Sequence, residues 1–310
     1  MKLRGANGAV EAAMIEIQRI LCPVDFSEAS RHALEHAVAV ANWYESEVAA
    51  LHVLTPAFVP QPPIFYTPPA PPSRQERRHA AETELRLWLD AARADAARSQ
   101  VLLDDGQPAT CILEHAGRLA AGLIVMGTHG LSGFDRLVLG SITEKVLRKA
   151  GCPVMTVPPA AATTAKVPYT RLLCPIDFSE SSLHAFGLAV SLAEEADAHL
   201  TLLYVLERPS SDAPLADPFE SAEYRRRSAE DARRRLEALV TSEMRVWCKP
   251  EIRVVEGKAY RKILDVAGES AIDLIVIGVR GRSAADLAIF GSTTNQVVRH
   301  AACPVLTRVA

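Results

Sequence analysis

Residues 19–41 read RILCPVDFSEASRHALEHAVAVA, and residues 171–193 read RLLCPIDFSESSLHAFGLAVSLA. The two stretches align without a gap, and each passes from an apolar, strand-like run into an amphipathic helical pattern. A chain of 310 residues is long enough for about two domains. The repeat therefore predicts two copies of one domain, arranged in tandem.

A glycine spacing is repeated as well. It consists of a GxxG turn and, after nine further residues, a Gly-Ser pair at the start of a helical pattern. The copies are Gly127, Gly130, Gly140 and Ser141 in the first half, and Gly278, Gly281, Gly291 and Ser292 in the second. Glycine has no Cβ, so an anion can approach the backbone N–H groups, and a helix N-terminus favours negative charge. The spacing predicts two phosphate cradles.

Composition and charge narrow the class of protein. Hydrophobic residues make up 49% of the chain and charged residues 23%, which is typical of soluble globular domains. A net charge of −3 gives no electrostatic basis for binding nucleic acid. The arginine-rich stretch at 225–235 is interpreted as a solvated helix with i,i+4 ion pairs. The expected pairs are Glu223–Arg227, Glu230–Arg234 and Asp231–Arg235.

The sequence also bears on the compartment. No apolar run reaches the ~18 residues that a membrane-spanning helix needs, and the N-terminus has no apolar signal core. The six cysteines show no metal-ligand spacing and are expected to be reduced, buried thiols. These features predict a cytoplasmic protein with no membrane partner.

Strand-like and helical patterns alternate along each half. In the first half, strands are expected at 19–24, 47–54, 100–103, 122–126 and 153–157, and helices at about 27–43, 74–98, 108–120 and 141–149. This βαβα alternation predicts an α/β fold with a parallel, doubly wound sheet. Domains are expected at 15–158 and 169–310, joined by a linker at 159–168, with a disordered extension at 1–14 and an extended Pro-rich loop at 56–72.

An aspartate follows the first strand of each half. Because proline removes a ladder donor, Pro23 and Pro175 are expected to end their strands. Asp25 and Asp177 then lie at the carboxyl edge of the sheet, where open α/β folds bind ligands and where the glycine turn also faces. Such an aspartate accepts from a ribose hydroxyl or a base amino group, or joins the solvation shell of a metal. The competing interpretation is an Asx-type turn over residues 26–28. The serines at 27 and 179 are predicted helix N-caps.

The motifs CPVDFS and CPIDFS, each followed by GxxG-x9-GS, resemble the tandem form of the UspA-like universal stress protein family. The resemblance implies a Rossmann-like (adenine nucleotide alpha hydrolase-like) domain in each half, with five strands in the order 3-2-1-4-5. It also implies ATP, or ADP or AMP, at the carboxyl edge, since this is the site in members that keep the glycine motif. Mg²⁺ is the expected counterion of the nucleotide.

The same resemblance assigns one nucleotide site to each half. In the first, base and ribose contacts fall to Pro23, Asp25 and Val53, and ribose or phosphate contacts to Met126, Gly127, Gly130, Gly140, Ser141 and Ile142. The matching residues of the second half are Pro175, Asp177, Val205, Ile277, Gly278, Gly281, Gly291, Ser292 and Thr293. Arg280 is an added candidate of the second turn, and its guanidinium either makes bidentate phosphate contacts or points to solvent. The turns differ, because Thr128 and His129 are replaced by Val279 and Arg280 with Arg282 close behind, so unequal affinities are expected.

Three functions stay open. The chain has neither a GxxxxGK[ST] phosphate loop nor a GxGxxG fingerprint, which disfavours a kinase, a motor ATPase and a dinucleotide enzyme. The favoured function is an ATP-binding regulator in a stress response. The alternatives are a slow Mg²⁺-dependent ATPase that uses His129, Arg280 or Arg282, and an interaction module without nucleotide.

The last strand of each half, at 153–157 and 304–309, is apolar and would be an exposed edge in an isolated domain. In the family these strands pair about a two-fold axis. An intramolecular pseudo-dimer is therefore expected, and a further homodimer is left open.

Overall fold

The protein was analysed as a computed structural model that describes residues 17–55, 72–130, 139–159, 161, 167–207, 222–279 and 291–308. The chain divides into two compact units, one formed by Ile17–Val167 and the other by the chain from Pro168 onward. The expected extension at 1–14, most of the Pro-rich loop, and the candidate ligands Arg280, Gly281 and Arg282 lie outside the described residues.

The first unit has one five-stranded parallel sheet in the order β3-β2-β1-β4-β5. This confirms the predicted α/β class and strand order. The elements are β1 (Arg19–Pro23), α1 (Glu28–Tyr44), β2 (Glu47–Leu54), α2 (Arg74–Ala91), β3 (Ser99–Asp105), α3 (Pro108–Arg118), β4 (Leu123–Gly127), α4 (Ser141–Lys149) and β5 (Val154–Val157).

The second unit repeats this sheet in the order β8-β7-β6-β9-β10, again with every pair parallel. It contains one helix, α7, that has no counterpart among the described elements of the first unit. The elements are β6 (Arg171–Pro175), α5 (Glu180–Glu195), β7 (His199–Leu206), α6 (Ala222–Leu239), α7 (Ser242–Trp247), β8 (Glu251–Glu256), α8 (Ala259–Glu269), β9 (Leu274–Gly278), α9 (Ser292–His300) and β10 (Val305–Arg308).

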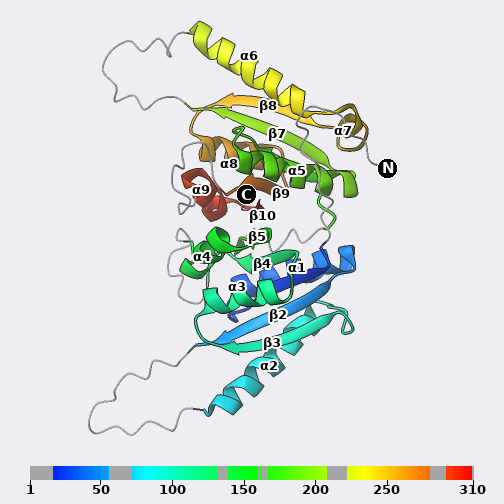
Figure 1. The fold of residues 1–310 in the computed structure, drawn as a ribbon, viewed down its shortest axis with the longest axis vertical. Coiled ribbons are helices and arrows are strands. Elements are labelled where there is room, and N and C mark those ends of the chain that lie inside the picture. Colours follow the sequence, from blue (N-terminus) through cyan, green and yellow to red (C-terminus); the bar gives the residue numbers. More distant parts are fainter. Residues whose placement is uncertain are drawn as a thin grey trace, which may run out of the picture. The chain divides into compact units, whose positions relative to one another are not determined.

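Helices cover both faces of the first sheet, and β3 shows which helix lies on which face. Adjacent residues of a strand point to opposite faces. Asp104 meets His115 of α3, whereas the next residue, Asp105, meets Arg74 and Arg78 of α2. α1 packs beside α2, and α4 packs beside α3. In Figure 1, α2 runs along the β3 side of the first sheet, and α6 runs along the β8 side of the second.

The strands are buried because their neighbours cover both faces. Every residue of β4 and of β9 is buried, which explains why both strands are continuous apolar runs rather than alternating ones. Proline ends the central strand as predicted, since β1 stops at Pro23 and β6 at Pro175. The carboxyl edge of each sheet begins at these prolines.

Two helix predictions need correction. α2 ends at Ala91 rather than near residue 98, because Arg93 takes a left-handed conformation (φ 61°) and the N–H of Ala94 bonds to the carbonyl of Leu89. On α6, only the Glu223–Arg227 pair forms as predicted, at 2.5 Å. The other ion pairs of α6 are Arg226–Glu230 and Arg234–Asp231, while the guanidinium of Arg235 lies 3.7 Å from the centre of the Phe178 ring.

The cysteines agree with the prediction in all but one respect. All six are free, and five are buried, whereas Cys152 is half-buried. Burial raises the pKa of the thiols of Cys22 and Cys174 far above the ordinary value, so both stay protonated. Within the described helices, none is long and apolar enough to cross a membrane.

Candidate functional site

The aspartate after the first strand is held by the helix that follows it. Asp25 Oδ1 accepts from the backbone N–H of Ser27 at 3.0 Å and from its hydroxyl at 2.5 Å. The Ser27 hydroxyl oxygen in turn caps α1 by accepting from the N–H of Ser30. Phe26, between them, has φ 63°. The Asx-type turn is therefore present, and it orients the carboxylate rather than excluding a role for it in binding.

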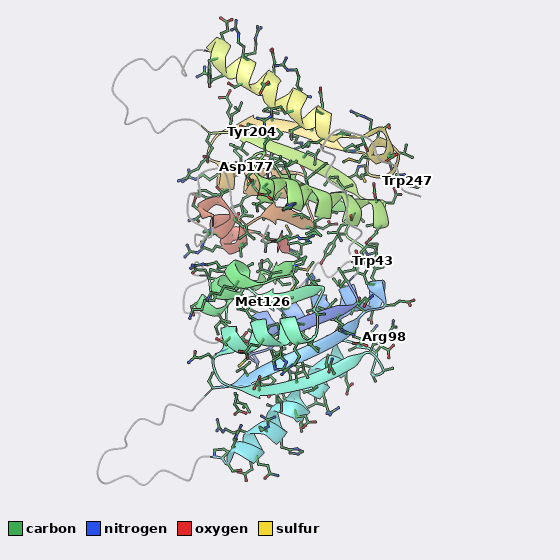
Figure 2. The ribbon with its side chains drawn as sticks, in the orientation of Figure 1. Trp43, Arg98, Met126, Asp177, Tyr204 and Trp247 are labelled. Carbon is green, nitrogen blue, oxygen red and sulfur yellow. The ribbon has the colours of Figure 1, made fainter. Side chains whose placement is uncertain are left out.

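The second unit repeats this arrangement atom for atom. Asp177 Oδ1 accepts from the N–H of Ser179 at 3.0 Å and from its hydroxyl at 2.6 Å, and Ser179 caps α5. Both predicted N-caps are confirmed. Figure 2 places Asp177 and Tyr204 near one end of the second sheet and Trp247 near the other end.

The structure brings the aspartate and the glycine turn together. A Cβ added to Gly130 would lie 2.6 Å from Asp25 Oδ2, which is closer than Cβ atoms in proteins come to other heavy atoms. Because glycine stands at 130, the carboxylate can lie against the backbone of the turn. The convergence expected from the order of the strands is thus observed in the first unit, where one oxygen of Asp25 faces Ser27 and the other faces Gly130.

The first glycine of each motif has a packing requirement of its own. A Cβ on Gly127 would lie 3.0 Å from the backbone carbonyl of Ala29 on α1, and a Cβ on Gly278 would lie 2.7 Å from that of Ser181 on α5. These glycines let the first turn of a helix touch the end of a neighbouring strand. Their predicted contact with a ligand stays a prediction, because the packing alone already requires glycine.

Gly140 differs, because no described atom of the fold requires glycine there. Its φ of −57° is open to any residue, and a Cβ would meet its nearest described atoms at an ordinary 3.4 Å. It begins α4, and no described side chain caps that helix. The first N–H groups of a helix have no acceptor within it. Ser141 and Ile142, the first residues of α4, are both exposed. Gly291 and Ser292 of α9 repeat the geometry.

A threonine that the sequence analysis missed supports each cradle. Thr143 Oγ1 donates to the carbonyl of Gly127 at 3.0 Å, and Thr294 Oγ1 donates to that of Gly278 at 2.7 Å. Both hydroxyls are buried and tie the helix start to the strand end. The signal was available in the sequence, since both copies read Gly-Ser-x-Thr.

The apolar candidates share one face of the sheet. Leu21 is paired with Ile124, and Pro23 and Met126 lie two residues further along their strands. Pro23 is paired with Leu51, two residues before Val53. Side chains two apart on a strand share a face. Met126, labelled in Figure 2, is buried, while Val53 is half-buried. In the second unit, Pro175 and Ile277 are buried and Val205 and Thr293 are half-buried.

The two turns also differ in their described residues. Thr128 is fully buried, and its Oγ1 lies 2.8 Å from His129 Nδ1, so this hydroxyl is engaged within the turn. Val279 replaces it in the second unit and is 2% exposed. Among the described residues, no group of three His, Cys, Asp or Glu side chains is placed to hold a metal ion.

Fold and site together define a class: two doubly wound α/β domains in tandem, each with an aspartate at the carboxyl edge of its sheet, which in the first domain lies beside a glycine-rich turn. The chain belongs to the universal stress protein family, which it matches over residues 16–158 and 168–307. The recognition made from the sequence motifs is confirmed.

Individual relatives agree with this assignment. The universal stress protein YxiE of Bacillus subtilis is 33% identical over 146 residues, which cover 45% of this chain and 97% of that protein. A universal stress protein of Mycolicibacterium smegmatis is 25% identical over 297 residues, covering 93% of this chain and 95% of that protein. The solved structure of a universal stress protein from Archaeoglobus fulgidus is 21% identical, covers 94% of this chain and 98% of that chain, and has a TM-score of 0.64. That likeness concerns the fold.

Proposed function

We propose that each half binds one adenine nucleotide, ATP, ADP or AMP, and that occupancy regulates the protein in a stress response. The observation that carries the proposal is the meeting of Asp25 and Gly130 beside the uncapped start of α4. An oriented carboxylate suits the hydroxyls of a ribose, and unpaired helix N–H groups suit phosphate. The same edge of the sheet thus offers a carboxylate that accepts hydrogen bonds from the nucleoside and N–H groups that donate hydrogen bonds to the phosphates.

Regulation is favoured over catalysis by the kind of groups in the cradle. Backbone N–H groups and the hydroxyl of Ser141 hold a phosphate, but none of them activates a water molecule. Mg²⁺ would be held through the phosphates. The competing proposals are a slow ATPase with His129 or Arg280 at the phosphates, and an interaction module without nucleotide. We also place the protein in the cytoplasm, where its six free cysteines would stay reduced.

The test is nucleotide titration of the full-length chain by calorimetry, with and without Mg²⁺. Two sites per chain are expected for the wild type. Gly140→Ala should remove the first site and Gly291→Ala the second, because the added methyl group occupies the cradle. Stability should hold, since the φ of both residues suits alanine. The matched control is Gly151→Ala, whose Cβ would meet nothing within 4 Å.

The outcomes separate the three proposals. Binding without turnover that is lost in the two cradle variants supports the regulator. Hydrolysis of ATP in a single-turnover assay, abolished by the double variant Gly140→Ala with Gly291→Ala, supports the ATPase. If the folded wild type binds no nucleotide, the regulator and the ATPase are both overturned, and the interaction module is the remaining proposal.

A further inference from the structure

We propose that Asp104 determines specificity at the base end of the first site: its carboxylate accepts a hydrogen bond from the exocyclic amino group of a purine, and the second site lacks this acceptor. The inference rests on the proposed nucleotide site. It predicts that the two sites select their bases differently.

Strand register places Asp104 beside a candidate base contact. Asp104 of β3 is the register partner of Val53 of β2, and partners in a parallel pair point to the same face. Pro23 and Met126 lie on that face as well. β3 is two strands from β1, so Asp104 stands about 10 Å from the strand that carries Asp25, taking ~4.8 Å per strand. With the ribose at Asp25 and the phosphates beyond it at β4, the far edge of the base points toward β3.

The Asp104 carboxylate is ionised, oriented and still accessible. Oδ1 accepts from the N–H of Asp105 at 2.8 Å, and Oδ2 lies 2.9 Å from His115 Nε2. These two hydrogen bonds, that of Asp105 first, hold the pKa of Asp104 below its usual range. Its side chain is 37% exposed. Each carboxylate oxygen has a second lone pair, so both can accept once more.

His115 of α3 positions the Asp104 carboxylate. The imidazole is 5% exposed, and Nη2 of Arg118 lies 2.7 Å from its Nδ1 and 2.8 Å from its Nε2. An ionised carboxylate can only accept, so His115 Nε2 is the donor of this hydrogen bond and its N–H is directed at Asp104. His115 is therefore a positioning residue that acts through Asp104.

The second unit has other residues at the three positions that correspond to Asp104, His115 and Arg118. The partner of Val205 on β8 is Val255. Helices α3 and α8 have the same length, and α8 has Val266 and Glu269 where α3 has His115 and Arg118. A valine cannot accept a hydrogen bond, so the base end of the second site is apolar at this position.

The chemistry predicts which bases are distinguished. Adenine carries an amino group on ring carbon C6 that donates to a carboxylate. Hypoxanthine carries a carbonyl oxygen on the same carbon, and the carboxylate repels that oxygen. A hydrogen bond to a charged group changes affinity by about 10-fold or more. The first site should thus prefer ATP to ITP by at least about that factor, and the second site should show a smaller preference.

The experiment measures the ATP to ITP affinity ratio in full-length chains that keep one site, with Gly291→Ala silencing the second and Gly140→Ala the first. Asp104→Val, which copies Val255, should reduce the ratio at the first site by about 10-fold through weaker ATP binding. Asp104→Asn keeps the shape and should reduce the ratio as well, which gives a second measurement if the valine variant is unstable.

The controls separate specificity from structure. Asp105→Asn changes the neighbouring carboxylate, which points to the opposite face, and should leave the ratio unchanged. His115→Val should lower the ratio, and His115→Gln, which keeps a donor, should restore part of it. If both Asp104 variants fold and bind ATP but keep the wild-type ratio of ATP to ITP affinity, the inference is overturned, while the proposed nucleotide site still stands. Failure of the wild type to bind any nucleotide overturns both.

Discussion

At the scale of the residue, the glycines of one motif are present for different structural reasons. Gly127 and Gly278 are required because a helix backbone touches them, Gly130 because a carboxylate does, and Gly140 by no described atom of the fold. A position where the fold tolerates alanine, at the open start of a helix, is where a ligand best explains glycine. The glycine motif is thus partly structural and partly functional.

Replacing the first glycines by alanine should destabilise the protein. Gly278→Ala is expected to lower the free energy of unfolding more than Gly127→Ala, because its Cβ would come within 2.7 Å of backbone rather than 3.0 Å. Overpacking of this kind costs about 1–3 kcal/mol. Urea unfolding measures the loss, with Gly151→Ala as the control. Equal stability of all three variants would contradict this account.

At the scale of the element, the start of α1 links stability to the site. Ser27 caps the helix and also holds Asp25, so one side chain serves both. Ser73 caps α2 through a reciprocal capping box with Glu76, and this cap does not involve the site residues. The two serines therefore form a matched pair.

We expect Ser27→Ala and Ser73→Ala each to lower the free energy of unfolding by about 1 kcal/mol, the usual cost of losing an N-cap. Only Ser27→Ala should also weaken nucleotide binding at the first site, because it releases Asp25. Urea unfolding and calorimetry on the same preparations measure both effects. A similar loss of affinity in Ser73→Ala would show that the effect is one of stability alone.

α1 also carries a buried histidine that predicts a pH dependence. His36 is fully buried, its Nε2 lies 3.2 Å from the carbonyl oxygen of Ala161, and its Nδ1 has no partner among the described residues. Burial, the largest effect, lowers the pKa of His36, and the hydrogen bond to Ala161 and the charge of Glu35 only partly oppose it. The unfolded chain takes up a proton as the pH falls through about 6.5, whereas the folded chain resists it.

The free energy of unfolding should therefore fall as the pH drops below about 6.5, by no more than ~1.4 kcal/mol per pH unit from this residue. His36→Leu copies Leu188 of the second half and should reduce that slope. Thermal and urea unfolding between pH 5 and 8 measure it. His184→Leu, at an exposed position of α5, is the control and should keep the wild-type slope.

At the scale of the whole molecule, the chain is a tandem repeat of one domain, and some of the differences between its halves lie at the sites. The sheets share strand order, aspartate, N-cap and threonine, whereas Asp104, His115 and Thr128 have no equivalent in the second half. We expect two inequivalent binding events per chain for this reason. We also propose that the two halves pair with each other as an intramolecular pseudo-dimer.

That proposal predicts a difference between the full chain and an isolated half. Residues 168–310 alone would leave the apolar strand β10 as a sheet edge, bonded only to β9, and should self-associate. The full chain at the same concentration should scatter light as a single chain. A monomeric half-chain would contradict the pseudo-dimer, and a full chain of twice the mass would support the further homodimer.

Sequence reasoning reached what depends on local patterns. The N-caps and the strand-ending prolines follow from spacing within a few residues, and the α/β class follows from the alternation of such patterns along each half. The internal repeat is visible by direct alignment of the two halves, and the motif resemblance added the strand order and the family. The end of α2 was misjudged, because a left-handed Arg93 is not signalled by its residue type. Two of three ion pairs on α6 differed, since several partners were within reach of each arginine.

The amino-acid sequence by itself determined that the chain is a tandem of doubly wound domains with an aspartate and a glycine turn in each. Only the tertiary structure decided which glycines serve packing, and that Asp104, His115 and Arg118 meet beside Val53. The physical reason is that sequence periodicity indicates which residues share a face of one helix or strand. The register between strands and the face that a helix covers are set by packing between segments far apart in the chain.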